Sequence, residues 1–288
     1  MTSRIDYNDP RAVGGFSLAY HREMLSDMKR VIPLMRAIEA HCKDKVVFES
    51  GTGTGVLSIT AARAGARAVF CSEIDPAIAA FAKQNIAKSG CADRIQLIEG
   101  STLDVKPSDL GGLKPQVLIA ENLSTWQVTE PQNQVINHLR NHVAESGAIA
   151  IPAITRNYLQ LAQTEYTFFD TVKLSCHFFE FSGIRGPIQL SKPELFTEFD
   201  YSTTNDVTID NTITVTAWTP GTVNSLRLTS PIEYSSSNHF DFSDSLMPPV
   251  VIPLTHSLSV RAGDRVNVTI RYQTNTRWED VQCETRLA

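Results

Sequence analysis

Two glutamates nine positions apart, Glu121 and Glu130, have the clearest potential for chemistry. Glu121 follows the apolar run 117–120, which predicts a strand, and Glu130 precedes Pro131 at the expected start of a helix. The loop between them can fold back so that both carboxylates face one pocket. A guanidinium suits such a pair, because it is planar and offers five N–H donors in a fork that matches carboxylates. Two carboxylates that hold it would orient one nitrogen for reaction.

The same pair of glutamates has a simpler structural interpretation. The helix dipole favours an acid such as Glu130 in a first helical turn, and Glu121 would then be a surface acid at a strand end. For a random pair of glutamates this interpretation is the more common one. The motifs around the pair therefore decide between a site and two unrelated acids.

A glycine-rich turn at residues 51–55 follows the apolar run 46–48 and Glu49. Its three glycines are two positions apart, and a helical pattern begins at Val56. Glycine lets the backbone turn sharply and approach a ligand, while the helix start offers free N–H groups. A dinucleotide-binding G-x-G-x-x-G would place a small residue where this chain has Val56, which disfavours NAD and FAD. An acid followed by G-x-G-x-G resembles the S-adenosylmethionine loop of class I methyltransferases.

Strand and helix patterns alternate after this turn, at residues 67–73, 76–88, 95–99, 117–120, 136–143 and 148–151. Over residues 45–152 this alternation indicates an α/β domain with a doubly wound, Rossmann-like parallel sheet. The resemblance of its glycine turn implies that this domain binds S-adenosylmethionine. Before it, residues 16–40 have the spacing of two short helices, with Pro33 tolerated near the start of the second. We assign residues 1–44 to an N-terminal helical segment that closes over the cofactor.

Glu73 ends the second expected strand, eighteen positions after Gly55. A Rossmann-like fold places a carboxylate under the ribose hydroxyls near this offset. Asp75 is the alternative, although it could instead cap the following helix. We favour Glu73, because side chains at strand ends point into the cofactor crevice.

After Pro152 the chain changes to alternating strand patterns, and helical spacing nearly vanishes. The clearest strand patterns lie at residues 158–162, 207–209, 213–217, 258–260 and 266–270. A short turn containing glycine separates the last two, which are expected to pair as a hairpin. Residues 153–288 are therefore predicted to form an all-β domain, an antiparallel barrel or sandwich.

Composition limits the class of partner. The chain has 288 residues, 42% of them apolar, and a formal net charge of −5, which favours a cationic substrate over nucleic acid. Five cysteines without C-x-x-C spacing, and no apolar signal segment at the N-terminus, predict a cytoplasmic protein. No run approaches eighteen apolar residues, so no membrane span is expected. The seven histidines show no ligand spacing, so no metal is predicted.

Several motifs together resemble the protein arginine methyltransferase family, from about residue 16 to the C-terminus. Residues 21–30 match the family's helix pattern of a His, then Glu-Met-Leu, an Asp and an Arg. Residues 43–57 resemble its acid and glycine segment. The family's two catalytic glutamates flank a loop with the nine-residue spacing of Glu121 and Glu130.

The resemblance implies a role for each matching position. Glu121 and Glu130 would hold an arginine guanidinium. Met24 would pack near the transferred methyl, and His21 would lie close to the cofactor and the second glutamate. Arg30 would bind the carboxylate of S-adenosylmethionine, and the full set of implied cofactor contacts is Arg30, Glu49, Gly51, Thr52, Gly53, Glu73, Ile74, Thr102, Leu103 and Glu121.

The resemblance also implies a homodimer, because family members usually pair through an arm that projects from the β-barrel. Residues 178–199 lie about where that arm should be. The substrate would lie between the two domains.

The chain departs from the family at four places. One is the start of the chain, where the family's Tyr-Phe-x-x-Tyr that folds over the cofactor is not recognisable. Residues 122–125 replace the Trp-Met-Gly-Tyr that usually follows the first glutamate. The Thr-His-Trp loop falls near residues 245–248, and His239 is close but not in place. The adenine-contacting acid falls at Leu103, which leaves Asp104 or backbone groups for that contact.

We predict an S-adenosylmethionine-dependent N-methyltransferase that acts on the guanidino group of free arginine, a small metabolite or a protein arginine. One alternative is a small-molecule O- or N-methyltransferase on the same fold, with Glu121 or His21 as general base. Another is a non-catalytic S-adenosylmethionine-binding scaffold, because the loop lacks its usual aromatic residues. A nucleic-acid methyltransferase would show Asp/Asn-Pro-Pro-Tyr/Phe after the fourth strand, where this chain has Ala-Glu-Asn-Leu.

Overall fold

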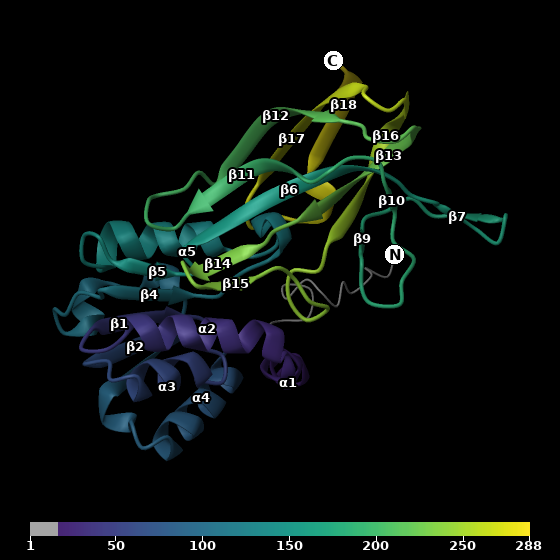
Figure 1. The fold of residues 1–288 in the computed structure, drawn as a ribbon. Coiled ribbons are helices and arrows are strands. Elements are labelled where there is room, and N and C mark those ends of the chain that lie inside the picture. The colour runs from purple at the N-terminus through teal and green to yellow at the C-terminus, as the bar shows by residue number, and fades with distance from the viewer. Residues whose placement is uncertain (1–16) are drawn as a thin grey trace.

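The computed structural model describes residues 17–288, so residues 1–16 of the predicted N-terminal segment lie outside the described part of the chain. A parallel sheet with helices around it lies against an elongated antiparallel β part (Figure 1). The helices are α1 (Leu18–Ser26), α2 (Met28–His41), α3 (Val56–Arg63), α4 (Pro76–Lys88) and α5 (Gln132–His138), the last continued by a π-helical turn, Leu139–Val143. Short 3₁₀ turns lie at Ala92–Arg94, Thr102–Asp104, Pro107–Leu110, Thr125–Gln127 and Trp278–Asp280.

The parallel sheet has the order β3-β2-β1-β4-β5, as predicted for a doubly wound fold. Its strands are β1 (Val46–Ser50), β2 (Ala68–Glu73), β3 (Ile95–Glu99), β4 (Val117–Ala120) and β5 (Ile149–Ile151). The strand order reverses between β1 and β4, whose last residues Ser50 and Ala120 are register partners. Ligands bind at such a switch point, outside the carboxyl ends of the strands. The glycine turn after β1 and Glu121 after β4 are therefore neighbours.

Alternate residues of the central strands pack into two different cores. Val47, with Val117, faces a core that contains Leu34 and Ile38 of α2. Phe48 faces the opposite core, which α5 and much of the β part complete. Because both faces are covered, the strands read as continuous apolar runs in the sequence.

The β part confirms the predicted antiparallel domain and curls into a half-barrel. Its longest sheet has the order β15-β14-β6-β13-β16-β9, with β10 and β11 also paired to β6, and a second sheet has the order β12-β17-β18. Its strands are β6 (Ile154–Gln163), β7 (Thr167–Phe168), β8 (Val172–Lys173), β9 (Phe178–Phe179), β10 (Ile188–Gln189), β11 (Glu194–Asp200), β12 (Thr208–Thr216), β13 (Gly221–Thr229), β14 (Ile232–Ser235), β15 (Asn238–Phe240), β16 (Val250–Val260), β17 (Arg265–Gln273) and β18 (Gln282–Leu287).

Two details of the predicted β domain were wrong. The patterns at 207–209 and 213–217 belong to one continuous strand, β12. The expected hairpin between β16 and β17 does not form, because β16 pairs with β13 and β9, whereas β17 pairs with β12 and β18. In the turn between them, Gly263 donates to the Ala217 carbonyl and Ala217 donates back to Asp264. These bonds direct the chain into the β12 sheet.

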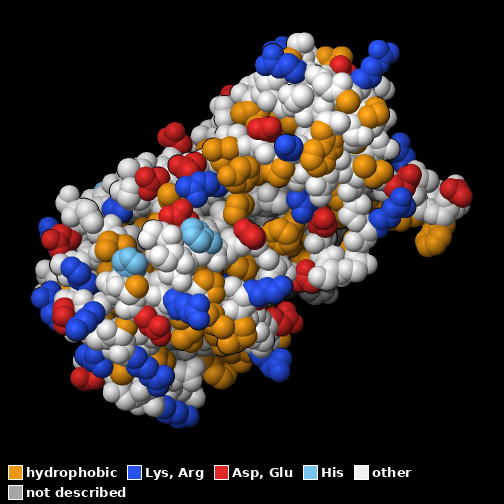
Figure 2. All heavy atoms as spheres, in the orientation of Figure 1, with side chains coloured by type: hydrophobic (Ala, Val, Ile, Leu, Met, Phe, Trp, Pro, Cys, Tyr) orange, Lys and Arg blue, Asp and Glu red, His pale blue; other side chains and the backbone are white. Residues whose placement is uncertain are grey.

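The segment 178–199, predicted as a projecting arm, contains three strands that pair with the main sheet. β9 pairs with β16, and β10 and β11 pair with β6. The part that extends away from the molecule is the β7–β8 hairpin (Figure 1). Its tip carries Phe169, which is 95% exposed, and Figure 2 shows apolar side chains at the end of this projection.

Two helices precede the parallel sheet, as predicted. They meet at Asp27, so Pro33 lies inside α2 rather than at its start. α2 is anchored by buried residues that include Leu34 and Ile38. α1 has no fully buried residue and lies over the end of the sheet where the pocket opens.

Candidate active site

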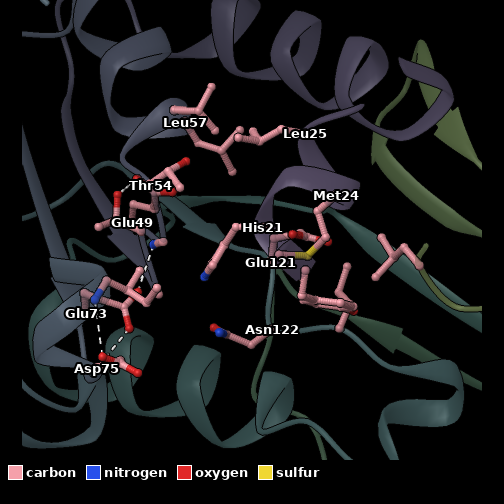
Figure 3. A pocket seen from close by; sticks show the side chains of 18 of the residues that line it. His21, Met24, Leu25, Glu49, Thr54, Leu57, Glu73, Asp75, Glu121 and Asn122 are labelled. Atoms are coloured by element: carbon pink, nitrogen blue, oxygen red, sulfur yellow. Dashed lines mark hydrogen bonds between the residues drawn. The ribbon is translucent and has the colours of Figure 1, made fainter. Parts of the chain in front are cut away.

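A cavity of about 560 Å³ lies at the switch point of the parallel sheet. Its walls come from α1, α2, the glycine turn, the ends of β2 and β4, and Leu246 of the β part. In Figure 3, Glu73 and Asp75 lie on one side, Met24 and Glu121 on the other, and His21 and Asn122 between them. The predicted residues that line the cavity are His21, Met24, Arg30, Glu49, Gly51, Thr52, Gly53, Glu73, Ile74, Glu121 and Glu130.

The glycine turn gives the cavity a backbone wall. Gly51 and Gly53 have φ of +65° and +57°, which other residues rarely adopt. The Gly53 amide donates to Glu73 Oε2 at 2.8 Å. A Cβ on Gly53 would meet His21 Cε1 at 2.9 Å, and one on Gly51 would meet Asn122 Nδ2 at 2.8 Å. Only glycine lets the backbone come this close to the cavity.

Glu49 lies beneath the glycine turn and is 1% exposed. Its Oε2 accepts hydrogen bonds from the hydroxyls of Thr52, at 2.7 Å, and Ser58. Burial raises the pKa of Glu49 from 4.5 to about 7, against the effect of these hydrogen bonds. Glu49 thus ties the turn to the start of α3 and titrates near neutrality.

Glu73 and Asp75 were the two candidates for the ribose contact, and Asp75 was also a candidate helix cap. Asp75 caps α4, because its Oδ1 accepts from the amides of Ala77, at 2.8 Å, and Ile78, at 3.2 Å. Glu73 is 8% exposed at the end of β2 and faces the cavity. Besides the Gly53 amide, it accepts the Asp75 amide at 3.0 Å, which fixes its carboxylate. The ribose contact of Glu73 stays a prediction.

Arg30 and Glu121 form a buried ion pair inside the cavity wall. Arg30 Nε donates to Glu121 Oε1 at 3.1 Å, and Nη2 donates to Oε2. The third nitrogen, Nη1, is buried and has no hydrogen-bond partner among the described residues. Burial favours a lower pKa of Arg30, but the charge of Glu121 outweighs it and raises that pKa. Arg30 therefore stays a cation with one donor free.

The loop from Glu121 to Glu130 brings both glutamates to the same cavity. Its middle residue, Trp126, is fully buried in the β part and stacks on Phe196 at 4.9 Å between ring centres. The Trp126 indole N–H donates to the carbonyls of Tyr158 and Thr229. This anchor lies between Glu121 and Glu130, which is 8% exposed, and both glutamates line the cavity.

α1 carries Tyr20, His21 and Met24 over the cavity. The β part holds this helix through the Ser245 carbonyl, which accepts from Tyr20 Oη at 3.4 Å, and through Asp27, which accepts from Ser245 Oγ at 2.6 Å. Burial lowers the pKa of His21, against the opposing charge of Glu73. Its imidazole is therefore neutral at neutral pH.

Two predicted cofactor residues lie outside the cavity wall. Thr102 is buried, and its hydroxyl bonds to those of Ser50, at 2.7 Å, and Ser72, at 2.6 Å. This hydroxyl cluster holds three strand ends together. Leu103 is 44% exposed and does not line the cavity. Ile74 does line it, at the rim, where it is 71% exposed.

The sequence reasoning missed Trp126, Tyr20 and Asn122 as parts of the site. Tyr20 precedes His21 in the helix motif, so its position was a usable signal. Asn122 was noted only as a departure, yet its Oδ1 accepts from Ser50 and its amide group lies over Gly51. No local pattern in the sequence predicts that Trp126 is buried.

Within residues 17–288, no group of three His, Cys, Asp or Glu side chains is arranged to hold a metal ion. None of the helices in that part of the chain is long and apolar enough to cross a membrane. Charged side chains of both signs are interspersed over the face shown in Figure 2.

Comparison with known proteins places this site in a family. The family model for ribosomal protein L11 methyltransferase (PrmA) matches residues 34–175. An uncharacterised protein of Methanocaldococcus jannaschii is 28% identical over 91% of this chain and 95% of its own length. Protein arginine N-methyltransferase 7 of Drosophila ananassae is 31% identical over 55% of this chain and 23% of its own length. Arginine N(omega)-methyltransferase of Streptomyces achromogenes subsp. streptozoticus is 32% identical over 51% of this chain and 41% of its own length.

Solved structures agree on the fold. A chain of the Trypanosoma brucei PRMT1 enzyme–prozyme complex with AdoHcy matches with a TM-score of 0.74 and 18% identity, over 93% of this chain and 96% of that one. Protein arginine methyltransferase 10 of Arabidopsis thaliana matches with a TM-score of 0.75 and 16% identity, over 94% and 93%.

The parallel sheet, the glycine turn and these matches define a methyltransferase. Within that class, the chain resembles the protein arginine methyltransferase family, by sequence over about half of its length and by fold over nearly all of it. It spans less than half the length of both named arginine methyltransferases that it matches by sequence, but nearly all of the archaeal relative.

Proposed function

We propose that this chain transfers a methyl group from S-adenosylmethionine to a guanidino nitrogen of an arginine-type substrate. The observation that carries the proposal is the meeting of Glu121 and Glu130 in the same cavity as the glycine turn. Two buried carboxylates next to a methyl-donor site suit a planar cation. A pair of unrelated surface acids would not converge in this way.

The cavity fits the cofactor by two independent features. Arg30 Nη1 is a buried donor without a partner among the described residues, so it can take the carboxylate of the methionine part. Gly51 and Gly53 form a cradle that any Cβ would fill, and their backbone can approach the ligand closely. Glu73, fixed at the end of β2, would accept from the ribose hydroxyls. When bound, S-adenosylmethionine supplies an activated methyl on its sulfonium sulfur.

The contact between Glu121 and Arg30 supports a role for this carboxylate in holding a guanidinium. Both of its oxygens accept from Arg30, so a two-point fork forms on this carboxylate within the protein itself. Each carboxylate oxygen has two lone pairs, which leaves acceptor capacity for a second guanidinium. With Glu130 on the other side, the substrate cation would be held in one plane with one nitrogen facing the methyl.

His21 would take part in the proton balance. The methylated nitrogen must lose one proton, and a neutral imidazole is a suitable acceptor. Burial keeps the pKa of His21 low, so it is neutral at neutral pH, and it lies in the cavity between Glu73 and Glu121. Met24 lines the same wall and would pack beside the methyl.

The guanidine carrier is free arginine, a small guanidino metabolite or a protein arginine. The names of the relatives support both ends of this range, because one denotes a protein arginine enzyme and another an arginine Nω-methyltransferase. The predicted homodimer and cytoplasmic location belong to the same proposal. Five free cysteines agree with a reducing compartment.

The test is release of S-adenosylhomocysteine with free arginine, agmatine and an arginine-rich peptide as separate acceptors. Glu121→Gln and Glu130→Gln should each lower kcat by roughly 10²–10⁴-fold, as for contacts made in the transition state. Glu121→Gln should also lower thermal stability, because Arg30 then stays buried without its anion. Glu99→Gln, an exposed acid at another strand end, is the matched control. Turnover on hydroxylated acceptors alone would favour the small-molecule alternative. Cofactor binding without turnover on any acceptor would favour the scaffold.

A further inference from the structure

Gln132, the first residue of α5, holds both peptide groups that flank Glu121. Its Nε2 donates to the carbonyl of Ala120 at 2.8 Å, and its Oε1 accepts from the amide of Asn122 at 2.9 Å. The Gln132 side chain is fully buried, as is Ala120. One side chain therefore satisfies the backbone immediately before and immediately after the first glutamate.

These two bonds take the place of the backbone hydrogen bonds that a neighbouring strand would make. β4 ends at Ala120, and the chain leaves the strand at Glu121. A buried carbonyl or amide without a partner costs about 1–3 kcal/mol. The side chain of Gln132 acts here as a short piece of neighbouring strand, which extends the order of β4 through the position of Glu121.

The same residue is tied to the second glutamate by the chain itself. Glu130 lies two positions before Gln132, with Pro131 between them. Two residues span at most about 7 Å, and proline removes one of the rotations in that span. Gln132 is thus linked to both ends of the loop: to the backbone beside Glu121 by hydrogen bonds, and to Glu130 by the short stretch of chain between them.

The other anchors of the loop lie at its middle. The backbone amide of Trp126 donates to Ser230 Oγ at 2.8 Å, and the Tyr272 hydroxyl donates to the backbone carbonyl of Trp126 at 2.9 Å. These contacts place the loop on the β part, but they do not set the distance between its two ends. Gln132 is the described side chain whose hydrogen bonds reach the backbone on both sides of Glu121.

We propose that Gln132 is a positioning residue that sets the separation and relative orientation of the Glu121 and Glu130 carboxylates. The inference rests on the proposed function, because it assigns Gln132 an effect on how tightly the pair fits a flat cation. A guanidinium needs both carboxylates in one plane, and a shift of about 1 Å can cost about 10²-fold in rate. The Gln132 side chain has no hydrogen bond to Arg30, Gly53 or Glu73, so the cofactor contacts should change less than the pair of glutamates.

The test compares Gln132→Met with Gln134→Met. Gln134 lies on the same helix and donates to the carbonyl and hydroxyl of Thr274, both at 2.9 Å, so the same substitution removes comparable bonds away from Glu121. Gln132→Met should lower kcat with a guanidino substrate by 10–100-fold and leave the Kd of S-adenosylmethionine within twofold. Gln134→Met should keep kcat within about threefold. Equal kcat values in the two variants would overturn the proposal.

A second variant covers the case in which Gln132→Met fails to fold. Gln132→Glu keeps the size and the acceptor for the Asn122 amide, but it can donate to the Ala120 carbonyl only when protonated. Its kcat relative to wild type should therefore recover as the pH is lowered, a response that a loss of packing would not produce. A constant ratio across pH would count against the role.

Amide hydrogen exchange separates this inference from the proposed function. The Asn122 amide should exchange at least tenfold faster in Gln132→Met than in wild type, and unchanged in Gln134→Met, whether or not any substrate is turned over. If wild type methylates no guanidine but the exchange result holds, the function fails and the positioning role stands. If wild type is active and Asn122 exchange is unchanged, the positioning role fails alone.

Discussion

The guanidinium of Arg30, from helix α2, lies in a two-point fork on the carboxylate of Glu121, at the end of β4. A predicted cofactor ligand and a predicted substrate ligand are thus bonded to each other. Arg30 is buried and Glu121 is only 12% exposed, and Arg30 keeps one nitrogen without a hydrogen-bond partner among the described residues. The pair connects the two halves of the proposed site, so a change in either member should affect both halves.

Removal of Arg30 should therefore cost stability as well as cofactor affinity. Arg30→Ala leaves the Glu121 carboxylate buried without its cation, which should lower the free energy of unfolding by about 3–5 kcal/mol. The Kd for S-adenosylmethionine should rise at least tenfold. Glu121→Gln, which leaves no uncompensated carboxylate, should unfold at a higher temperature than Arg30→Ala.

Chemical denaturation and isothermal titration would measure both effects. Arg156→Ala is the control, because Arg156 forms ion pairs with Glu198 and Glu233 but is a third exposed, so the loss of stability should be much smaller. Equal decreases in the free energy of unfolding of Arg30→Ala and Arg156→Ala would show that the buried ion pair contributes no more than an exposed one.

Glu49 should make stability depend on pH near neutrality. Its pKa is about 7 in the folded chain and about 4.5 when unfolded, so folding favours its protonated form. The stabilisation is fully present below pH 4.5 and is lost as the pH rises through 7, by about 3 kcal/mol. Glutamine cannot ionise, so the free energy of unfolding of Glu49→Gln should increase relative to that of wild type between pH 5 and pH 8.

Urea denaturation at several pH values, with Glu99→Gln as the exposed control, would measure that difference. A difference that stays constant between pH 5 and pH 8 would mean that Glu49 does not titrate in this range.

Gly53 should be required for cofactor binding more than for folding. Gly53→Ala adds a Cβ that meets His21 at 2.9 Å, on a backbone with φ +57°. Gly112→Ala is matched, because Gly112 has φ +80° but nothing within 4 Å of an added Cβ. Both should lose about 1–2 kcal/mol of stability from the left-handed backbone. Only Gly53→Ala should raise the Kd of S-adenosylmethionine, by at least tenfold, as measured by titration calorimetry; similar Kd values would argue against the cradle.

The indole N–H of Trp126 should matter for both loop position and stability. Trp126→Phe removes donation from a fully buried indole to the carbonyls of Tyr158 and Thr229, and should cost about 1–3 kcal/mol. Trp218→Phe also removes a bond to a carbonyl, that of Gln189, but Trp218 is 50% exposed, so water can replace it. Thermal denaturation of the two variants would show the contrast, and a larger loss for Trp218→Phe would contradict it.

Local patterns in the sequence were enough to predict the parallel half of the fold. α4 begins and ends where it was predicted, because Asp75 caps it and Pro76 suits its first turn. The buried strands β1 and β4 read as apolar runs, and the glycine spacing indicated the turn. These patterns depend on residues that are close in sequence, so they can be recognised without knowing how the rest of the chain folds.

The β part shows where local patterns stop. Alternation identified β16 and β17, but not that they join different sheets, because a strand pattern states which face is buried and not which strand is adjacent. The bonds between Gly263, Asp264 and Ala217 made that choice. The segment 178–199 was likewise assigned to sheet contacts by partners more than twenty residues away in sequence, on β6 and β16.

The sequence by itself determined the chemistry available to this protein: a glycine turn, two glutamates nine apart and an arginine on a helix. Only the tertiary structure decided that Arg30 bonds to Glu121, that Trp126 enters the β part and that Gln132 holds the backbone of Glu121. The physical reason is that buried polar groups must find partners wherever the fold brings them. Those partners lie up to 146 positions away along the chain, beyond the reach of any local pattern.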